Sequence, residues 1–369
     1  MLNFSPDASL AGEIRVVENA IVVPWGRGPK QNMARPAGVF TADGEFCADA
    51  MTYRAANRPT TVCPEFPTAD EVTEAISGTV LFGGLAYGHF GHALCESIAR
   101  LWAVDNCDEQ IDSVLFLPKK KVTWPERSLL QVRQLVESLG NLPPCTAINE
   151  PTRVERLVIA PQGFGVNNMI GGAPEFRDFT DRRWRQRVKA NGPEKLYISR
   201  SEVFSKRGRL LLEERVEEHL KAEGFTIFHP QQHDLQTQLE HYKAATVIVS
   251  TDNSALHLAA FVAGVDTKVA ILLRRPGKIY LDFQEQLRRF ASIDPAISDN
   301  CTRYWFREGE AMQLNEVISL VDFEKTAQSL AGAGIISNAN WTNPTAQDVD
   351  LALEEFEERG DILLEEVFV

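Results

Sequence analysis

Two histidines and a glutamate lie close together in the segment GHFGHALCESIARLW, residues 88–102. If residues 91–104 form a helix with about 3.6 residues per turn, His92, Glu96 and Arg100 share one stripe and the apolar side chains face the other side. A neutral imidazole beside a carboxylate can take a proton from a hydroxyl, because the carboxylate orients the ring and stabilises its cation. The segment therefore predicts a general base, for which we favour His92 with Glu96 as its orienting partner.

Other interpretations of this segment stay open. His89 falls in the loop before the predicted helix, so it is either the base itself or a neighbouring contact to the substrate. A capping histidine followed by an ordinary surface pair of Glu96 and Arg100 explains the same residues without chemistry. A metal site is a third interpretation, because HxxH followed by a glutamate supplies ligands, although zinc-binding histidines on one helix face more often sit four residues apart.

A second candidate is the basic segment YISRSEVFSKRGR, residues 197–209. A predicted strand brings Ser199 and Arg200 to its carboxyl end. Further basic side chains follow before the next predicted helix: Lys206, Arg207 and Arg209. Arginine forks bind phosphate oxygens in pairs, and a helix N-terminus adds its dipole and free N–H groups. The segment predicts a phosphate site, and the alternative is a basic loop that only links strand to helix.

The third candidate, VIVSTDNSALH, also passes from a strand into a helix. Asp252, Asn253 or Ser254 can cap this helix, and its amides would face the same sheet edge as Arg200; His257 lies one turn in. The alternative is plain helix capping. Since the chain has neither a strand–GxGxxG–helix motif nor a GxxxxGK[ST] loop, dinucleotide cofactors and P-loop nucleotide hydrolysis are disfavoured.

These segments belong to two blocks in which strands and helices alternate, which predicts an α/β chain with two Rossmann-like domains facing a cleft. Turn residues at 191–193 separate the blocks. The first block contains predicted strands at 79–84, 113–117 and 156–160, with helices at 91–104 and 126–139. The second contains strands at 195–199, 225–228, 246–250 and 268–273, with helices at 210–223, 235–245 and 254–264. Strand ends of the first block and the helix that follows place four residues at the cleft, where α/β domains bind ligands: Gly83, Gly84, Tyr87 and Arg100.

Composition narrows the function classes. The 369 residues carry a net charge of −13, which argues against general nucleic-acid binding. The charge is uneven, because residues 346–369 hold nine acids and one base, whereas residues 177–209 hold eleven bases and four acids. The six cysteines are scattered and form no CxxC pair, which argues against a zinc site or a disulfide framework. The sequence also shows no evident signal peptide and no apolar span of roughly 20 residues. Together these features favour a cytoplasmic protein.

Three blocks of the sequence resemble glycosyltransferase family 61, specifically bacterial members associated with capsular or other surface polysaccharides. They are FGGLAYGHFGHALCESIARLW, YISRSEVFSKRGRLLLEERVEEHLKAEGFTIFHP and LQTQLEHYKAATVIVSTDNSALH, in family order within residues 82–257. The matched positions are His89, His92, Glu96, Arg200, Arg207, Ser254 and His257. The chain departs from the family pattern at Asn253, where glycine is usual, and at Gln231, where an acid is usual.

The resemblance implies an inverting transferase of the two-domain GT-B type. Its domains would be 1–192 for the acceptor and the base, 193–345 for the donor, and 346–369 as an acidic tail helix near the domain junction. The implied donor is a nucleotide-diphosphate sugar, a UDP-sugar first among them, and the acceptor is a glycan hydroxyl. We expect no obligatory metal, no nucleic-acid partner, and at most peripheral association with a membrane. The alternatives are a GT-B-like sugar-nucleotide epimerase and a catalytically silent protein that binds a glycan or nucleotide.

Overall fold

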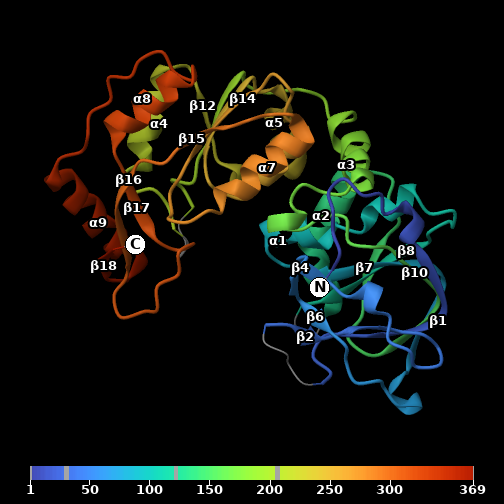
Figure 1. The fold of residues 1–369 in the computed structure, drawn as a ribbon. Helices are drawn as coiled ribbons and strands as arrows, with labels where there is room; N and C mark the ends of the chain where they lie inside the picture. Colours follow the sequence, from blue (N-terminus) through green and yellow to red (C-terminus); the bar gives the residue numbers. More distant parts are fainter. Residues whose placement is uncertain (1, 29–32, 120–123, 204–207, 369) are drawn as a thin grey trace. The chain divides into compact units, whose positions relative to one another are not determined.

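The computed structural model describes residues 2–28, 33–119, 124–203 and 208–368. The chain is α/β and divides into two compact units, Met1–Arg187 and Val188–Val369 (Figure 1). Each unit has its own parallel strands and its own hydrophobic interior.

A mixed sheet forms the centre of the N-terminal unit. Its order in the described residues is β3-β1-β10-β7-β8-β9, in which β10, β7, β8 and β9 run parallel and β1 runs antiparallel to both its neighbours. The strands are β1 Arg15–Val23, β3 Gly38–Phe40, β7 Glu74–Ala86, β8 Ser113–Pro118, β9 Cys145–Ala147 and β10 Thr152–Ile159. The smaller elements are β2 Arg35–Pro36, β4 Tyr53–Ala55, β5 Arg58–Pro59, β6 Thr61–Val62, α1 Phe90–His92, α2 Leu130–Leu139 and α3 Pro174–Thr180.

Two elements of this unit differ from the sequence prediction. Strand β7 does not stop at its glycine pair but continues to Ala86, so both glycines lie inside the sheet. The single helix predicted over 91–104 is wrong: α1 passes into a π-helical turn at Ala93–Ser97, and a 3₁₀ turn follows at Leu101–Asp105. Because the turns differ in residues per turn, the stripe calculated for a regular helix does not extend past the π-helical turn.

The C-terminal unit is built on a parallel sheet in the order β12-β11-β13-β14-β15. Helix α4 lies on one face and α5, α6 and α7 pack side by side on the other (Figure 1). The elements are β11 Lys195–Ile198, α4 Glu213–Ala222, β12 Thr226–Phe228, α5 Leu235–Ala244, β13 Val247–Thr251, α6 Ala255–Val262, β14 Lys268–Leu272, α7 Tyr280–Ala291 and β15 Ala296–Ser298. The chain leaves β11 toward one side of the sheet and β13 toward the other. The carboxyl ends of these neighbouring strands are therefore the topological switch point, where open α/β sheets bind ligands.

A second layer covers the C-terminal sheet. It consists of β16 Cys301–Arg307, β17 Ile318–Val321, α8 Phe323–Gly332, α9 Ala346–Gly360 and β18 Leu364–Val367. The tail helix predicted over 346–369 is confirmed only as far as Gly360, because Leu364–Val367 forms β18 and pairs with β16. Helix α9 inserts Val349 into the same core cluster as Val216 of α4. An ion pair of 2.7 Å between Arg215 and Asp348 fastens it at one end. The position of this helix relative to the domain junction stays a prediction.

Candidate functional site

The predicted His–Glu pair is present in the N-terminal unit. The imidazole Nδ1 of His92 lies 2.6 Å from Oε1 of Glu96, within hydrogen-bonding distance. The Glu96 side chain has no exposed surface, whereas 29% of the His92 side chain is exposed. The pair lies where α1 enters the π-helical turn, a distortion that is frequent at functional sites. A buried carboxylate thus orients a solvent-accessible imidazole, which is the arrangement that a general base requires.

Aromatic and basic side chains surround this pair. The ring of Tyr87 stacks on His92 with centroids 5.2 Å apart, and His89 meets His92 edge-on at 5.3 Å. The ammonium of Lys119 lies 4.6 Å from the centre of the Tyr87 ring. Burial, and next the charge and hydrogen bonding of Glu96, raise the pKa of the Tyr87 phenol, so this hydroxyl stays protonated beside the carboxylate. Tyr87 therefore contacts both members of the pair: its ring stacks on His92, and its hydroxyl interacts with Glu96.

Three residues predicted to lie at the cleft are buried inside the N-terminal unit. Arg100 is 1% exposed and donates hydrogen bonds to the carbonyls of Ala160 at 3.0 Å and Met51 at 2.6 Å, so it does not extend the His–Glu stripe. Gly83 and Gly84 are buried within β7. A Cβ on Gly83 would approach the Phe116 ring to 2.5 Å, and Gly84 has a φ of +89°. Glycine at position 83 thus leaves room for the Phe116 ring, and glycine at position 84 allows a backbone conformation that other residues rarely adopt.

The predicted helix start in the C-terminal unit is capped by Asn253. Its Oδ1 accepts a hydrogen bond from the Ala255 N–H at 2.9 Å, and its Nδ2 donates to the Ser250 hydroxyl at 2.9 Å. Asn253 thereby satisfies a donor of the first turn of α6 and fixes the end of β13. Ser254 is half-buried at the entry of α6 and makes no side-chain cap. The departure from glycine at Asn253 thus has a structural use.

The strand end carrying Arg200 is held by a buried carboxylate. Glu213 accepts hydrogen bonds from the Arg200 backbone N–H at 2.9 Å and from the Tyr197 hydroxyl at 3.0 Å. Burial raises the pKa of Glu213. Ser199 is 1% exposed and its hydroxyl donates to Glu217 at 2.6 Å, so the structure assigns it to this buried network and not to a ligand surface.

Four more residues are predicted to lie at the phosphate site or at the start of the helix beside it. Two of them have partners within the protein, and the other two are not described. Arg209 is buried and forms an ion pair of 2.6 Å with Glu214, so its guanidinium already has a carboxylate partner. His257 is 8% exposed and its Nδ1 lies 2.6 Å from Oε1 of Gln286, so its ring is fixed against α7. Lys206 and Arg207 lie outside the described residues.

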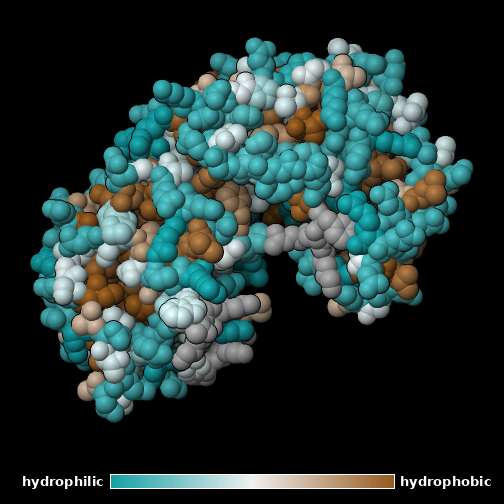
Figure 2. Space-filling model, turned by 180° about the vertical axis from the view of Figure 1, so that it is seen from behind, coloured by the Kyte–Doolittle hydropathy of each residue, from teal (hydrophilic) through white to brown (hydrophobic). Residues whose placement is uncertain are grey.

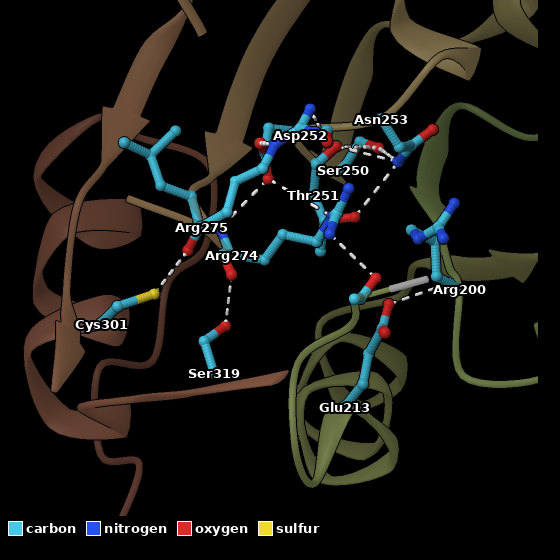
Figure 3. A network of polar contacts seen from close by, with 12 residues as sticks. Arg200, Glu213, Ser250, Thr251, Asp252, Asn253, Arg274, Arg275, Cys301 and Ser319 are labelled. Carbon is cyan, nitrogen blue, oxygen red and sulfur yellow. Dashed lines mark hydrogen bonds and ion pairs between the residues drawn. The ribbon is translucent and has the colours of Figure 1, made fainter. Parts of the chain in front are cut away.

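Sequence reasoning missed a cluster beside Arg200, formed by Asp252, Arg274 and Arg275 (Figure 3). Asp252 is fully buried; its Oδ1 accepts a hydrogen bond from the Arg274 backbone N–H at 3.1 Å, and its Oδ2 pairs with Nε of Arg275. The Arg274 guanidinium donates to the carbonyl of Gly208 at 2.9 Å. The pair Arg274–Arg275 directly follows strand β14, so the argument that selected Arg200 at the end of β11 would also have selected these residues.

The basic island at 177–209 is explained in part by local ion pairs. Arg182 and Arg183 both pair with Asp105, at 3.2 and 2.5 Å. Arg187 donates to the Leu139 carbonyl at 2.9 Å. These three side chains fasten the end of the N-terminal unit, so their positive charge has a structural use there.

The described residues offer neither a cluster of metal ligands nor a membrane-spanning helix. In the described part of the chain, no three His, Cys, Asp or Glu side chains gather closely enough to hold a metal ion. No helix among the described residues has the length and apolar composition to cross a bilayer. The face seen in Figure 2 is largely hydrophilic, with its apolar side chains in separate groups.

A known family model matches a segment that spans parts of both candidate regions. Residues 90–270 match the family model Glycosyltransferase 61. This segment contains the His92–Glu96 pair of the N-terminal unit and the sheet edge with Arg200 and Asn253 in the C-terminal unit. A search of curated proteins finds no match. The Glycosyltransferase 61 match supports a glycosyltransferase activity, which implies a sugar donor and an acceptor.

Proposed function

We propose that the protein is a cytoplasmic, inverting glycosyltransferase of the GT-B type that transfers a sugar from a nucleotide-diphosphate sugar to a glycan hydroxyl. The observation that carries the proposal is the His92–Glu96 pair, at 2.6 Å, within the segment that matches the family. A bacterial capsular or surface polysaccharide is the proposed product class. Residues 1–192 would bind the acceptor and residues 193–345 the donor.

The proposed reaction is a single displacement. The acceptor oxygen attacks the anomeric carbon while the bond from that carbon to the diphosphate oxygen breaks on the opposite face, which inverts the configuration. His92 takes the acceptor proton, and Glu96 stabilises the resulting imidazolium. The departing diphosphate gains negative charge, which cationic side chains and helix amides would stabilise. Arg200 and the start of α6 supply such groups at the switch point of the C-terminal sheet.

This assignment needs no metal ion as an obligatory partner of the diphosphate. Two features support arginine as the counter-charge instead: the position of Arg200 at the end of β11 and the pair Arg274–Arg275 after β14. A UDP-sugar is the donor that we propose to test first.

The experiment is a transfer assay with a panel of nucleotide sugars and glycan acceptors, read by mass spectrometry and NMR. We expect a new glycosidic bond whose anomeric configuration is opposite to that of the donor, and loss of turnover in His92→Ala. Retained configuration would contradict the single displacement. Isomerised donor without transfer would support the epimerase, and donor binding without turnover would support a silent binding protein.

A further inference from the structure

The carboxyl edge of the C-terminal sheet carries three arginines that come from two strand ends. Arg200 follows β11, and Arg274 and Arg275 follow β14; β13 lies between these two strands. Figure 3 shows the Arg200 and Arg274 side chains extending into the region in front of Asn253, and their charges act on each other. The cluster thus lies at the edge and switch point where open α/β sheets bind ligands.

Within the cluster, Arg274 and Arg275 share a single carboxylate. Asp252 is the one carboxylate that pairs with Arg274 and Arg275 in the described residues. The neighbouring Glu213 is a weaker counter-charge because burial raises its pKa. Burial, together with the positive charges of Arg275 and Arg200, lowers the pKa of Arg274 to about 9 although Asp252 acts in the opposite direction. A bound anion would relieve this imbalance.

The guanidinium groups are also held in place before any ligand arrives. Nε of Arg275 pairs with Asp252 Oδ2, and its Nη2 donates to the Asp252 carbonyl at 3.2 Å. Arg274 is 4% exposed; its Nη1 is fixed by Gly208, but its Nε makes no hydrogen bond and lies 3.6 Å from Asp252 Oδ1. A buried donor without a hydrogen bond is costly, and planar guanidinium forks fit phosphate oxygens.

We propose that Arg200, Arg274 and Arg275, held by Asp252, form a binding site for a phosphate-bearing anion, which in the proposed reaction is the diphosphate of the donor. The inference rests on the proposed function for the identity of that diphosphate, but not for the site itself. In this proposal, Arg274 and Arg275 at the end of β14 supply the positive charge that the sequence analysis expected from Arg209, which pairs with Glu214.

The test measures binding of inorganic pyrophosphate, UDP and uridine to the full chain by calorimetry. We expect pyrophosphate and UDP to bind and uridine to bind far more weakly. Arg275→Gln should weaken both phosphate-bearing probes about 10- to 150-fold, the range for loss of a charged hydrogen bond. Arg288→Gln is the matched control, since Arg288 is an exposed arginine of α7 that pairs with Asp294. Arg200→Gln provides a second variant if Arg275→Gln does not fold.

The outcomes separate this site from the proposed function. If both folded variants bind pyrophosphate and UDP like the control, the site is refuted even if the wild-type protein transfers sugar. If the variants lose binding but no nucleotide sugar is turned over, the anion site stands and the proposed function fails. Tighter binding of UDP than of pyrophosphate identifies a nucleoside diphosphate, and equal binding identifies a free diphosphate. Full binding of uridine would overturn the assignment.

Discussion

Replacing Glu96 by glutamine tests whether the buried carboxylate acts through the imidazole. The substitution preserves shape but removes the charge that lies 2.6 Å from His92 Nδ1. A hydrogen bond to a charged group contributes about 1.5–3 kcal/mol. If that contribution is present when His92 gains the acceptor proton, the transfer rate should fall roughly 10- to 150-fold. Because the pair is in the N-terminal unit, the affinity for the donor should change little.

The assay is single-turnover transfer at saturating donor over a range of pH. We expect Glu96→Gln to lower the rate where it no longer depends on pH, because the imidazolium formed during transfer loses its partner. Glu175→Gln is the control, since Glu175 is a second buried carboxylate of this unit, bonded to Ser9 and the Leu10 N–H. An equal loss of rate in both folded variants, or none in Glu96→Gln, would refute a role through His92.

Three further predictions address the base, the scaffold and the buried carboxylate of the C-terminal unit. His92→Ala should lose about 10²–10⁴ in single-turnover rate and His89→Ala much less; the reverse order would exchange their roles. Gly83→Ala should lower the free energy of unfolding by about 1–3 kcal/mol in urea denaturation, because its Cβ meets the Phe116 ring; an unchanged unfolding midpoint would contradict the packing role. The raised pKa of Glu213 means that the folded state holds a proton that the unfolded state releases, so wild-type stability falls as pH rises from the ordinary carboxyl pKa through the raised one. Glu213→Gln should remove this dependence and gain stability relative to wild type across that window; parallel pH curves would show that Glu213 does not titrate there.

Sequence periodicity predicts the C-terminal sheet more accurately than the elements around His92. Strands such as Lys195–Ile198 and Val247–Thr251 are short apolar runs bounded by turn residues, so their positions follow from local signals. The segment after Phe90 has the composition of one helix, but it folds as successive α, π and 3₁₀ turns. Within this segment Arg100 donates hydrogen bonds to backbone carbonyls far along the chain, and no local pattern records such tertiary contacts.

The candidate site shows the same division. The contact between His92 and Glu96 was predictable because a spacing of four residues brings side chains together in either an α- or a π-helical turn. The function of a basic side chain at a strand end was not predictable from its charge alone. Arg200 and Arg209 are both arginines near a predicted strand end. Arg209, however, forms an ion pair with Glu214, and this pair is visible only in the folded structure.

The packing of α9 has a consequence for how the protein is made. The core that contains Val216 of α4 is completed by Trp341 and Val349. At about 5–20 residues per second, roughly 7 to 27 s of synthesis separate Val216 from Val349 on the ribosome. During that interval the nascent C-terminal unit exposes the apolar surface that α9 later covers, while the N-terminal unit, whose sheet closes with Thr152–Ile159, already has all its strands. A chaperone that binds nascent chains should therefore be retained mainly by the second half of the translation product.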